Sequence, residues 1–363
     1  MRFAVIGAGV IGALHAETIF QLRSTELIAV VDVEPEAARE LAARYGTLAL
    51  TDVDETLARA DVDAVAICTP SGQHAELVTR ALSAGKHVVV EKPLDVSLEA
   101  AHRVADAERA SGRRVTVISQ HRFDPASQLV FEAVRSGRLG RVTSGNAVIS
   151  WWRSQAYYDS AGWRGTWALD GGGALMNQGI HTVDLLVWFL GQPVEVFAWT
   201  GRLAHDRIEV EDTAAATIRF AGGVLGVIQA TTAAYPGLNA RVQLHGDRGS
   251  AVIDDDRLAY FHAAQAGESG PDLGAGSPDN QAEQVLASSS QPGRTSHTAQ
   301  YEDFVGSIAN DRSPLVTVGE ATRTLAVVIA IYESARTGRP VSVPGRVASG
   351  DARTDLESVD VVF

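Results

Sequence analysis

Two charged residues at the end of an apolar stretch are the first sign of chemistry in this sequence. Residues 88–90 in VVVEKPLD have the composition of a buried strand, and Glu91, Lys92 and Pro93 follow directly. An ammonium that is partly removed from water has a lowered pKa and can exchange a proton near neutral pH. We therefore predict that Lys92 is catalytic, with a buried ion pair between Lys92 and Glu91 as the alternative.

A second polar group lies within the otherwise apolar stretch LMNQGIHTVDLLVWFLG at 175–191, whose periodicity predicts a helix. Asn177, His181 and Asp184 share one face of a continuous helix at this spacing. We predict that His181 handles a proton together with Lys92, and that Asn177 and Asp184 contact the substrate. For His181 and Asp184 the alternative is a set of satisfied hydrogen bonds in the core.

A glycine pattern near the N-terminus predicts a nucleotide site. GAGVIG follows an apolar strand at 2–6 and opens a helix at 11–22. In this setting the first glycine permits a tight turn, the second lets pyrophosphate approach the backbone, and the third lets the helix pack against the strand. The phosphates then lie at the helix N-terminus. The residues expected to bind the dinucleotide here are Gly7, Gly9, Val10, Ile11 and Gly12.

The choice between NAD and NADP depends on Asp32, which lies 20 residues beyond Gly12 at the end of the second predicted strand. A carboxylate at this point binds the ribose 2′-hydroxyl and repels a 2′-phosphate. Val33 and Glu34 follow, without an arginine to accept that phosphate. We therefore predict NAD, with NADP less favoured, and contacts from Asp32 and Val33. A helix-entry role is the alternative for Asp32.

Later strands of the same domain end in further polar residues. The carboxyl ends of parallel strands form the edge where doubly wound sheets bind ligands. Arg122 follows the last of these strands and is predicted to contact the substrate. For His74 a capping or packing role is an equal alternative. The residues of this edge expected to contact the cofactor are Thr69, Pro70, Ser71, His74, Glu91, Lys92 and Gln120.

The connecting segment YYDSAGWRGTWALDGGG at 157–173 is rich in aromatic residues. Aromatic rings pack against pyranose faces, and Arg164 can bind a carboxylate or phosphate. We predict a substrate contact from Tyr158, with core packing as the alternative for both tyrosines and for Trp163. His297 opens a helix after a long polar segment and is a further substrate candidate, with a surface position at the helix end as the alternative.

The arrangement of apolar runs predicts two domains. Strands alternate with helices in 1–122, which predicts an α/β Rossmann domain with a doubly wound parallel sheet. Residues 123–344 hold many β-rich runs with turn sequences between them, which predicts an α+β domain with a mostly antiparallel sheet. Residues 263–296 are predicted to be a mobile loop within it, and 345–363 a loose C-terminal tail.

Composition narrows the class of partner. The formal net charge is −13, without a run of Lys or Arg, so nucleic acid is not expected to bind. One cysteine excludes a disulfide framework and a cysteine-based zinc site, and no other spacing predicts a metal. The sequence has neither a signal peptide nor an apolar run of transmembrane length, so no membrane association and a cytoplasmic location are expected.

The order and spacing of GAGVIG, TPSGQH, AGKHVVVEKPL and GIHTVDLL resemble the Gfo/Idh/MocA oxidoreductases, a likeness that continues through YEDFVGSI and IYESARTGRPVSVP. The resemblance implies an NAD-binding domain and then an open-faced sheet that often packs against another subunit, giving dimers or tetramers. It implies oxidation or reduction of a carbon bearing a hydroxyl or keto group on a sugar, cyclitol or nucleotide sugar. In such relatives the lysine of EKP contributes to catalysis, and a pair matching Trp163 and Arg164 touches the cofactor.

One position departs from part of that family. The residue matching Asn177 is commonly aspartate in inositol dehydrogenases. An amide cannot serve as a base or as an ionic partner of Lys92. Asn177 therefore argues against simple transfer of an inositol substrate, and it fits better with enzymes acting at C3 of pyranosides or nucleotide sugars.

Three functions remain open from the sequence. The leading one is an NAD-dependent dehydrogenase that reversibly oxidises a secondary hydroxyl to a ketone, with Lys92 and His181 handling the proton. A second is an NAD-dependent glycoside hydrolase that oxidises C3 transiently. A third is a non-catalytic regulator that senses NAD or a sugar.

Overall fold

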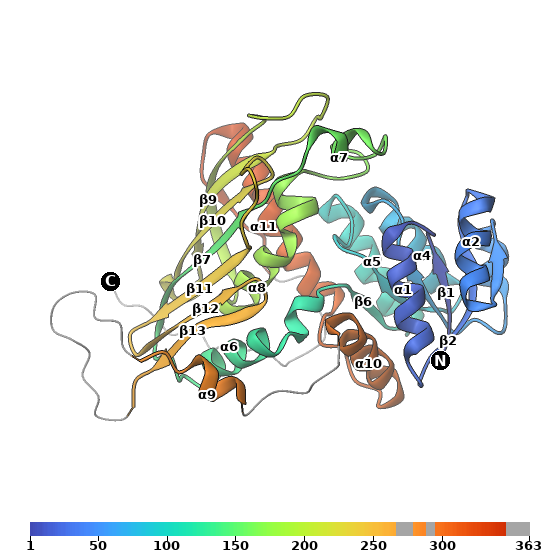
Figure 1. Ribbon diagram of the computed structural model, residues 1–363, viewed down its shortest axis with the longest axis horizontal. Helices are drawn as coiled ribbons and strands as arrows, with labels where there is room; N and C mark the ends of the chain where they lie inside the picture. Colours follow the sequence, from blue (N-terminus) through green and yellow to red (C-terminus); the bar gives the residue numbers. More distant parts are fainter. Residues whose placement is uncertain (266–278, 288–294, 346–363) are drawn as a thin grey trace. The chain divides into compact units, whose positions relative to one another are not determined.

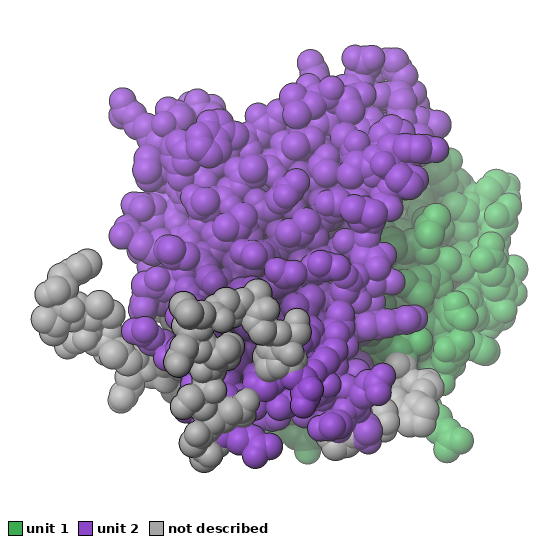
Figure 2. All heavy atoms as spheres, turned by 60° about the vertical axis from the view of Figure 1, so that its left-hand side comes forward, with its two compact units in different colours: residues 1–120, 166–171, 294–325 green, residues 121–165, 172–293, 326–363 purple. Residues whose placement is uncertain are grey.

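The computed structural model describes residues 1–265, 279–287 and 295–345. The chain divides into two compact units, coloured separately in Figure 2. Parts of the predicted loop (266–278 and 288–294) and nearly all of the predicted tail (346–363) lie outside the described residues. Unit 1 comprises 1–120, 166–171 and 294–325, and unit 2 comprises 121–165, 172–293 and 326–363.

Unit 1 contains a six-stranded parallel sheet in the order β3-β2-β1-β4-β5-β6, which confirms the predicted Rossmann fold (Figure 1). The strands are β1 (Arg2–Ile6), β2 (Glu26–Val31), β3 (Leu48–Leu50), β4 (Ala64–Ile67), β5 (His87–Val90) and β6 (Val115–Val117). The helices are α1 (Val10–Gln21), α2 (Pro35–Tyr45), α3 (Val53–Ala58), α4 (His74–Ser83), α5 (Leu98–Ser111) and α10 (Ser296–Ala309).

The central strands of this sheet form because their residues are apolar on both faces. All of β4 is buried, as are the last three residues of β5. This is the pattern of a parallel sheet covered on both sides. Tyr301 and Phe304 of α10 pack into the same core as Phe3 of β1, so a helix from late in the chain completes unit 1.

Unit 2 contains an eight-stranded sheet in the order β13-β12-β11-β7-β10-β9-β8-β14. The β7–β10 pair is parallel and the other pairs are antiparallel, which confirms a mostly antiparallel sheet. Its strands are β7 (Val142–Ser150), β8 (Pro193–Gly201), β9 (Thr213–Phe220), β10 (Leu225–Thr231), β11 (Arg241–Gly246), β12 (Gly249–Asp254), β13 (Arg257–Ala263) and β14 (Val341–Ser342). Its helices are α6 (Pro125–Arg135), α7 (Gln155–Asp159), α8 (Ile180–Leu190) and α9 (Ala282–Ala287); α11 (Val318–Thr337) begins in unit 1 and ends in unit 2.

Each strand of the large sheet alternates between a buried and an exposed face. In β9 every second residue from Ala214 to Phe220 is buried and the residues between them are exposed. Leu186 of α8 lies over Gly145 of β7, where the missing side chain leaves room for the helix. One face of the sheet therefore packs on helices, and the other carries the exposed residues.

Two predicted elements differ from the structure. The helix predicted at 175–191 is interrupted, because 174–179 form a π-helical turn before α8 begins at Ile180. The loop predicted at 263–296 contains the helix α9, which packs beside β13 through hydrogen bonds of Asn280 and Gln281 to the strand. Within the described residues, no helix has the length and apolarity needed to cross a membrane.

Candidate active site

The turn between β1 and α1 has the geometry that the glycine pattern predicts. Gly7 has φ +103°, and a Cβ there would lie 2.6 Å from the carbonyl oxygen of Cys68. A Cβ on Gly12 would lie 1.8 Å from the oxygen of Gly7, whereas one on Gly9 would meet nothing within 4 Å. Gly7 and Gly12 therefore build the turn, and Gly9 leaves open space above it of the kind a pyrophosphate needs.

Asp32 directly follows β2 and lies beside this turn. Its Oδ2 accepts the amide of Ala8 at 2.7 Å and its Oδ1 accepts the amide of Glu34 at 2.9 Å. Val10 and Val33 are 88% and 82% exposed. The hydroxyl of Thr69, after β4, is buried and makes no hydrogen bond within the described chain. An open backbone cradle, a fixed carboxylate and an unpaired hydroxyl fit a dinucleotide with a free ribose 2′-hydroxyl.

His74 was predicted to contact the cofactor, and its ring is buried at the N-terminus of α4. Nδ1 lies 2.7 Å from the carbonyl oxygen of Pro93, and Nε2 lies 2.8 Å from that of Thr69. The side chain therefore ties the loop after β4 to the turn after β5. Pro70 and the buried Ser71 form the short segment between β4 and α4. The alternative of a packing role is the one that this geometry favours for His74.

Lys92 follows β5 at the carboxyl edge of the parallel sheet, and its peptide bond to Pro93 is cis. The side chain is half-buried. Burial lowers the pKa of the Lys92 ammonium, although the charges of Glu91 and Asp170 act in the opposite direction. A lysine with a lowered pKa is a candidate proton acceptor.

Glu91 has a second partner that the sequence did not indicate. Its Oε1 lies 2.8 Å from Nε2 of His15 on α1, and its Oε2 accepts the amide of Lys92 at 3.1 Å. Nδ1 of His15 lies 2.6 Å from the hydroxyl of Tyr301. Burial opposes the charge on Glu91, but the hydrogen bond from His15 and the nearby positive charges together outweigh it and lower the pKa to about 2. A buried ion pair thus fixes the backbone at Lys92.

His297 and Gln120 also belong to unit 1. His297 lies in the first turn of α10, and its ring is edge-on to that of His15, with centroids 6.0 Å apart. Gln120 begins the short 3₁₀ segment after β6. The predicted substrate contact of His297 is untested by this geometry and stays a prediction.

His181 lies in the first turn of α8 in unit 2 and is half-buried. Its ring is edge-on to that of His121, with centroids 5.1 Å apart. Nδ1 of His121 lies 2.9 Å from carboxylate oxygens of both Asp124 and Asp256. Burial opposes the charge on His121, but these hydrogen bonds outweigh it and raise the pKa to about 9. His181 therefore has an imidazolium as its neighbour at neutral pH.

Arg122 and Asp184 were both predicted to contact the substrate, and the structure pairs them with each other. Nε and Nη2 of Arg122 donate to the two oxygens of Asp184, both at 2.7 Å. The side chains are 1% and 5% exposed. Because the carboxylate and the guanidinium are buried and neutralise each other, we correct their assignment to positioning of α8, which carries His181.

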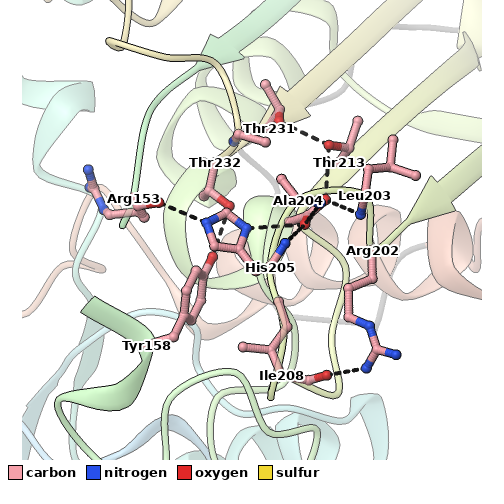
Figure 3. Close-up of polar contacts among 12 residues, drawn as sticks. Arg153, Tyr158, Arg202, Leu203, Ala204, His205, Ile208, Thr213, Thr231 and Thr232 are labelled. Atoms are coloured by element: carbon pink, nitrogen blue, oxygen red, sulfur yellow. Dashed lines mark hydrogen bonds and ion pairs between the residues drawn. The ribbon is translucent and has the colours of Figure 1, made fainter. Parts of the chain in front are cut away.

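Tyr158 also lies deeper than predicted. It is 4% exposed, packs with Ile208 and Val210, and bonds through its hydroxyl to that of Thr232 at 2.9 Å. Figure 3 shows its ring beside His205, whose Nε2 lies 2.7 Å from the carbonyl oxygen of Arg153. Core packing, the alternative given above, describes Tyr158 in place of a direct substrate contact.

Tyr157, the neighbour of Tyr158, is half-buried and joins a polar network. Nη1 of Arg164 and Nε2 of Gln178 both donate to its hydroxyl, at 2.6 and 2.8 Å. Gln178 also donates to Oδ1 of Asn177 at 2.8 Å. The guanidinium of Arg164 lies over the ring of Trp163, 4.7 Å from its centroid. Asn177, Trp163 and Arg164 of the prediction therefore lie in or beside one network.

Some residues of these networks were missed from the sequence. His15 lies one helical turn after Gly12 and so on the same side of α1. This spacing was the sequence signal for a role of His15 near the glycine turn. Asp256, a partner of His121, and Gln178, a partner of Tyr157, come from distant segments, and nothing in the local sequence identifies them. The missed residues are His15, Gln178, Arg153 and Asp124, together with Asp256, which completes the clamp of His121, Asp124 and Asp256.

Comparison with known proteins agrees with this arrangement. The model of an oxidoreductase family with an NAD-binding Rossmann fold, Gfo/Idh/MocA, matches residues 1–119, and the model of the GFO/IDH/MocA C-terminal domain matches residues 127–252. Inositol 2-dehydrogenase of Rhizobium meliloti is 31% identical over 268 residues, which are 73% of this chain and 78% of that protein. The scyllo-inositol 2-dehydrogenase (NAD(+)) of Bacillus subtilis is 26% identical over 94% of this chain and 96% of its own.

A solved structure is similar over almost the full length. The WlbA dehydrogenase from Bordetella pertussis, in complex with NADH and UDP-GlcNAcA, has a TM-score of 0.86 and 33% identity, covering 95% of this chain and 98% of that chain. Both domains, in the same order, are therefore shared with characterised dehydrogenases. The chain belongs to the Gfo/Idh/MocA family of oxidoreductases, and its N-terminal unit is an NAD-binding Rossmann domain.

Proposed function

We propose that this enzyme oxidises a secondary hydroxyl of a sugar, glycoside, cyclitol or nucleotide sugar to a ketone, reversibly, with Lys92 and His181 handling the proton. The burial and position of Lys92 support this proposal most directly. Its half-buried ammonium, with a pKa lowered by burial, follows β5 at the same sheet edge as the glycine turn after β1. This position supports a role for Lys92 as the proton acceptor, because sheets of this kind bind dinucleotides at that edge.

The chemistry assigns a distinct role to each polar group. NAD, which the glycine turn and Asp32 would hold, would supply the acceptor for the hydride of the carbinol carbon. The hydroxyl proton must leave in the same reaction, and Lys92 accepts it because burial favours the neutral amine. His181 hydrogen-bonds the same hydroxyl and orients or shares its proton. Asn177 can donate and accept hydrogen bonds but cannot take the proton, so it positions the substrate.

The names of relatives support a broad substrate class that includes both cyclitols and nucleotide sugars. One relative is named for inositol and a similar structure was solved with a nucleotide sugar. Both ligands carry secondary hydroxyls on a six-membered ring. We therefore propose that the substrate of this chain is a polyol with a six-membered ring, a class that contains both inositols and nucleotide sugars.

Lysine content makes a sharp test possible, because Lys86 and Lys92 are the two lysines of the sequence. Lys92→Arg keeps a cation but removes the group that can become neutral, and Lys86→Arg is the matched control at a lysine that donates to two backbone carbonyls. NADH formation is measured across polyols, sugars and nucleotide sugars at mildly alkaline pH.

We expect Lys92→Arg to lower kcat by about 10²- to 10⁴-fold, as for loss of a general base. Lys86→Arg should retain the wild-type rate. An unchanged kcat in Lys92→Arg, on a substrate that the wild-type enzyme oxidises, would remove Lys92 from the mechanism.

A further inference from the structure

Two arginines of unit 2 lack an acidic partner among the residues that the structure describes. Arg153 and Arg164 are both half-buried, and neither forms an ion pair with a carboxylate of the described chain. The buried Arg122, by contrast, has Asp184 as a bidentate partner. A chain with a net charge of −13 has carboxylates in excess, so their absence around these two guanidiniums needs a reason.

Arg153 is held in place by its surroundings. Its guanidinium lies over the ring of Trp151 at 5.2 Å and over that of Tyr157 at 5.4 Å. Its Nε donates to Oε1 of Gln178 at 3.0 Å. Its main-chain carbonyl lies against Nε2 of His205, as Figure 3 shows, and its amide donates to Thr232 at 2.9 Å. The cation is therefore fixed in place.

Arg164 is fixed from the other side of the same tyrosine. Its guanidinium carbon lies 4.3 Å from the ring centroid of Tyr157, and its Nη1 donates to the hydroxyl of that residue at 2.6 Å. Its Nε is buried and has no hydrogen-bond partner in the described chain. A buried donor without a partner carries a desolvation cost that a bound acceptor would remove.

The directions of the hydrogen bonds identify the hydroxyl of Tyr157 as a third donor, beside the two guanidiniums. Because Arg153 can only donate, the atom of Gln178 facing it is the oxygen, and Nε2 of Gln178 must donate to Tyr157. The oxygen of Tyr157 then accepts from both Gln178 and Arg164. Its own proton is left to donate to an acceptor outside this network.

We propose that Arg153, Arg164 and the hydroxyl of Tyr157 bind an anionic group of the substrate, a carboxylate or a phosphate. Arg164 then serves the substrate, in place of the cofactor contact that the resemblance implies. Guanidinium forks match the oxygens of both groups, and both are acceptors for a phenol. Gln178 joins this site to Asn177, one turn before His181. The assignment rests on the proposed function, because it makes the oxidised sugar an acidic one, such as a uronic acid or a sugar joined to a diphosphate.

The test compares acidic and neutral sugars on the NAD-loaded full chain. KM and kcat are measured for a hexuronate against the matching hexose, and for a nucleoside-diphosphate sugar against the free sugar, which separates a carboxylate from a phosphate. The variants are Arg153→Gln, Arg164→Gln and Arg153→Lys. Arg207→Gln is the control, since Arg207 pairs with Asp159 on the surface of the same unit. Thermal midpoints establish that each variant is folded.

We expect the acidic member of one pair to be preferred and Arg153→Gln to raise its KM by about tenfold or more, with a smaller change in kcat. Arg153→Lys should retain part of the preference, and Arg207→Gln all of it. Equal use of acidic and neutral sugars, with Arg153→Gln matching the control, would overturn the proposal. A rise in KM for NAD alone would overturn it too, since the arginines would then serve the cofactor.

Calorimetry tests anion binding independently of the proposed oxidation of the sugar. Binding of hexuronate and of uridine diphosphate to the NAD-loaded enzyme is measured for wild type, Arg153→Gln and Arg207→Gln. If no sugar yields NADH but an anion binds to wild type and not to Arg153→Gln, the oxidation is wrong and the anion site stands. If neither anion binds to the wild-type enzyme, the anion site is wrong, whatever the oxidation assay gives.

Discussion

At the scale of single residues, His121 makes stability depend on pH. Its pKa is raised to about 9 by Asp124 and Asp256, against the opposing effect of burial. A histidine whose pKa rises on folding stabilises the native state fully below its unfolded pKa, near 6.5, and loses this contribution as pH rises through the folded value. The clamp should therefore stabilise unit 2 at pH 6 and contribute little at pH 10.

The expected result is a difference between two pH values. His121→Asn should lower the free energy of unfolding more at pH 6 than at pH 10, in denaturant titrations of each variant against wild type. The exposed His102→Asn serves as the control for a general effect of removing a histidine. An equal loss at both pH values would mean that His121 acts through packing and not through its charge.

Asp32 decides the cofactor at the same scale. Its carboxylate is held by the amides of Ala8 and Glu34, so it is oriented before a ribose arrives. Asp32→Ala removes an acceptor for the 2′-hydroxyl and the repulsion of a 2′-phosphate. We expect KM for NAD to rise about tenfold and the preference for NAD over NADP to narrow. Glu34→Ala, next in sequence, is the control, and equal NAD and NADP use by wild type would contradict the role of Asp32.

At the scale of elements, two glycines of one turn should respond differently to the same methyl group. A Cβ on Gly12 would lie 1.8 Å from the oxygen of Gly7, so Gly12→Ala must move α1 away from β1. A Cβ on Gly9 meets no protein atom within 4 Å, so Gly9→Ala should fold normally and obstruct only the pyrophosphate. We expect a lowered thermal midpoint for Gly12→Ala, and for Gly9→Ala an unchanged midpoint with a raised KM for NAD. A normal midpoint in Gly12→Ala would contradict this reading of the turn.

Some of the helices, strands and turns could be predicted from the sequence, and others could not. The buried strands of unit 1 were predictable because residues apolar on both faces fit only a covered parallel sheet, and the glycine turn because its spacing has one mechanical use. The π-helical turn at 174–179 was not, since an apolar segment does not reveal an additional residue in one turn. It separates Asn177 from the α-helical register of His181.

Contacts between distant segments explain the other misses. Arg122 and Asp184 lie 62 residues apart, so no local pattern shows that they neutralise each other. The choice between Tyr157 and Tyr158 depends on α7 docking against Ile208 and Val210, which lie in another loop. Residue type therefore identified polar side chains with a special role, and tertiary packing decided which of them remain available to a ligand.

At the scale of the whole molecule, the exposed face of the large sheet of unit 2 carries several large apolar residues. Phe197 of β8 pairs with Thr217 of β9, which in turn pairs with Val227 of β10, so the three side chains form one row. Trp199 and Leu225 flank the row and are 65% and 59% exposed. Large apolar residues that gather on one exposed face mark an interaction site more often than single scattered ones do.

We therefore predict that the chain self-associates through this face into a dimer or tetramer. The double variant Trp199→Glu, Val227→Glu places like charges on β8 and β10, on either side of β9. Burying these unpaired charges in an interface is unfavourable and should outweigh the stabilisation from the remaining apolar contacts. Light scattering after size exclusion should then give a smaller mass than for wild type, with an unchanged far-ultraviolet spectrum. Phe20→Glu on α1, a residue that is 59% exposed, is the control for a general loss of apolar surface. A monomeric wild-type protein, or an assembly unaffected by the double variant, would remove this face from the interface.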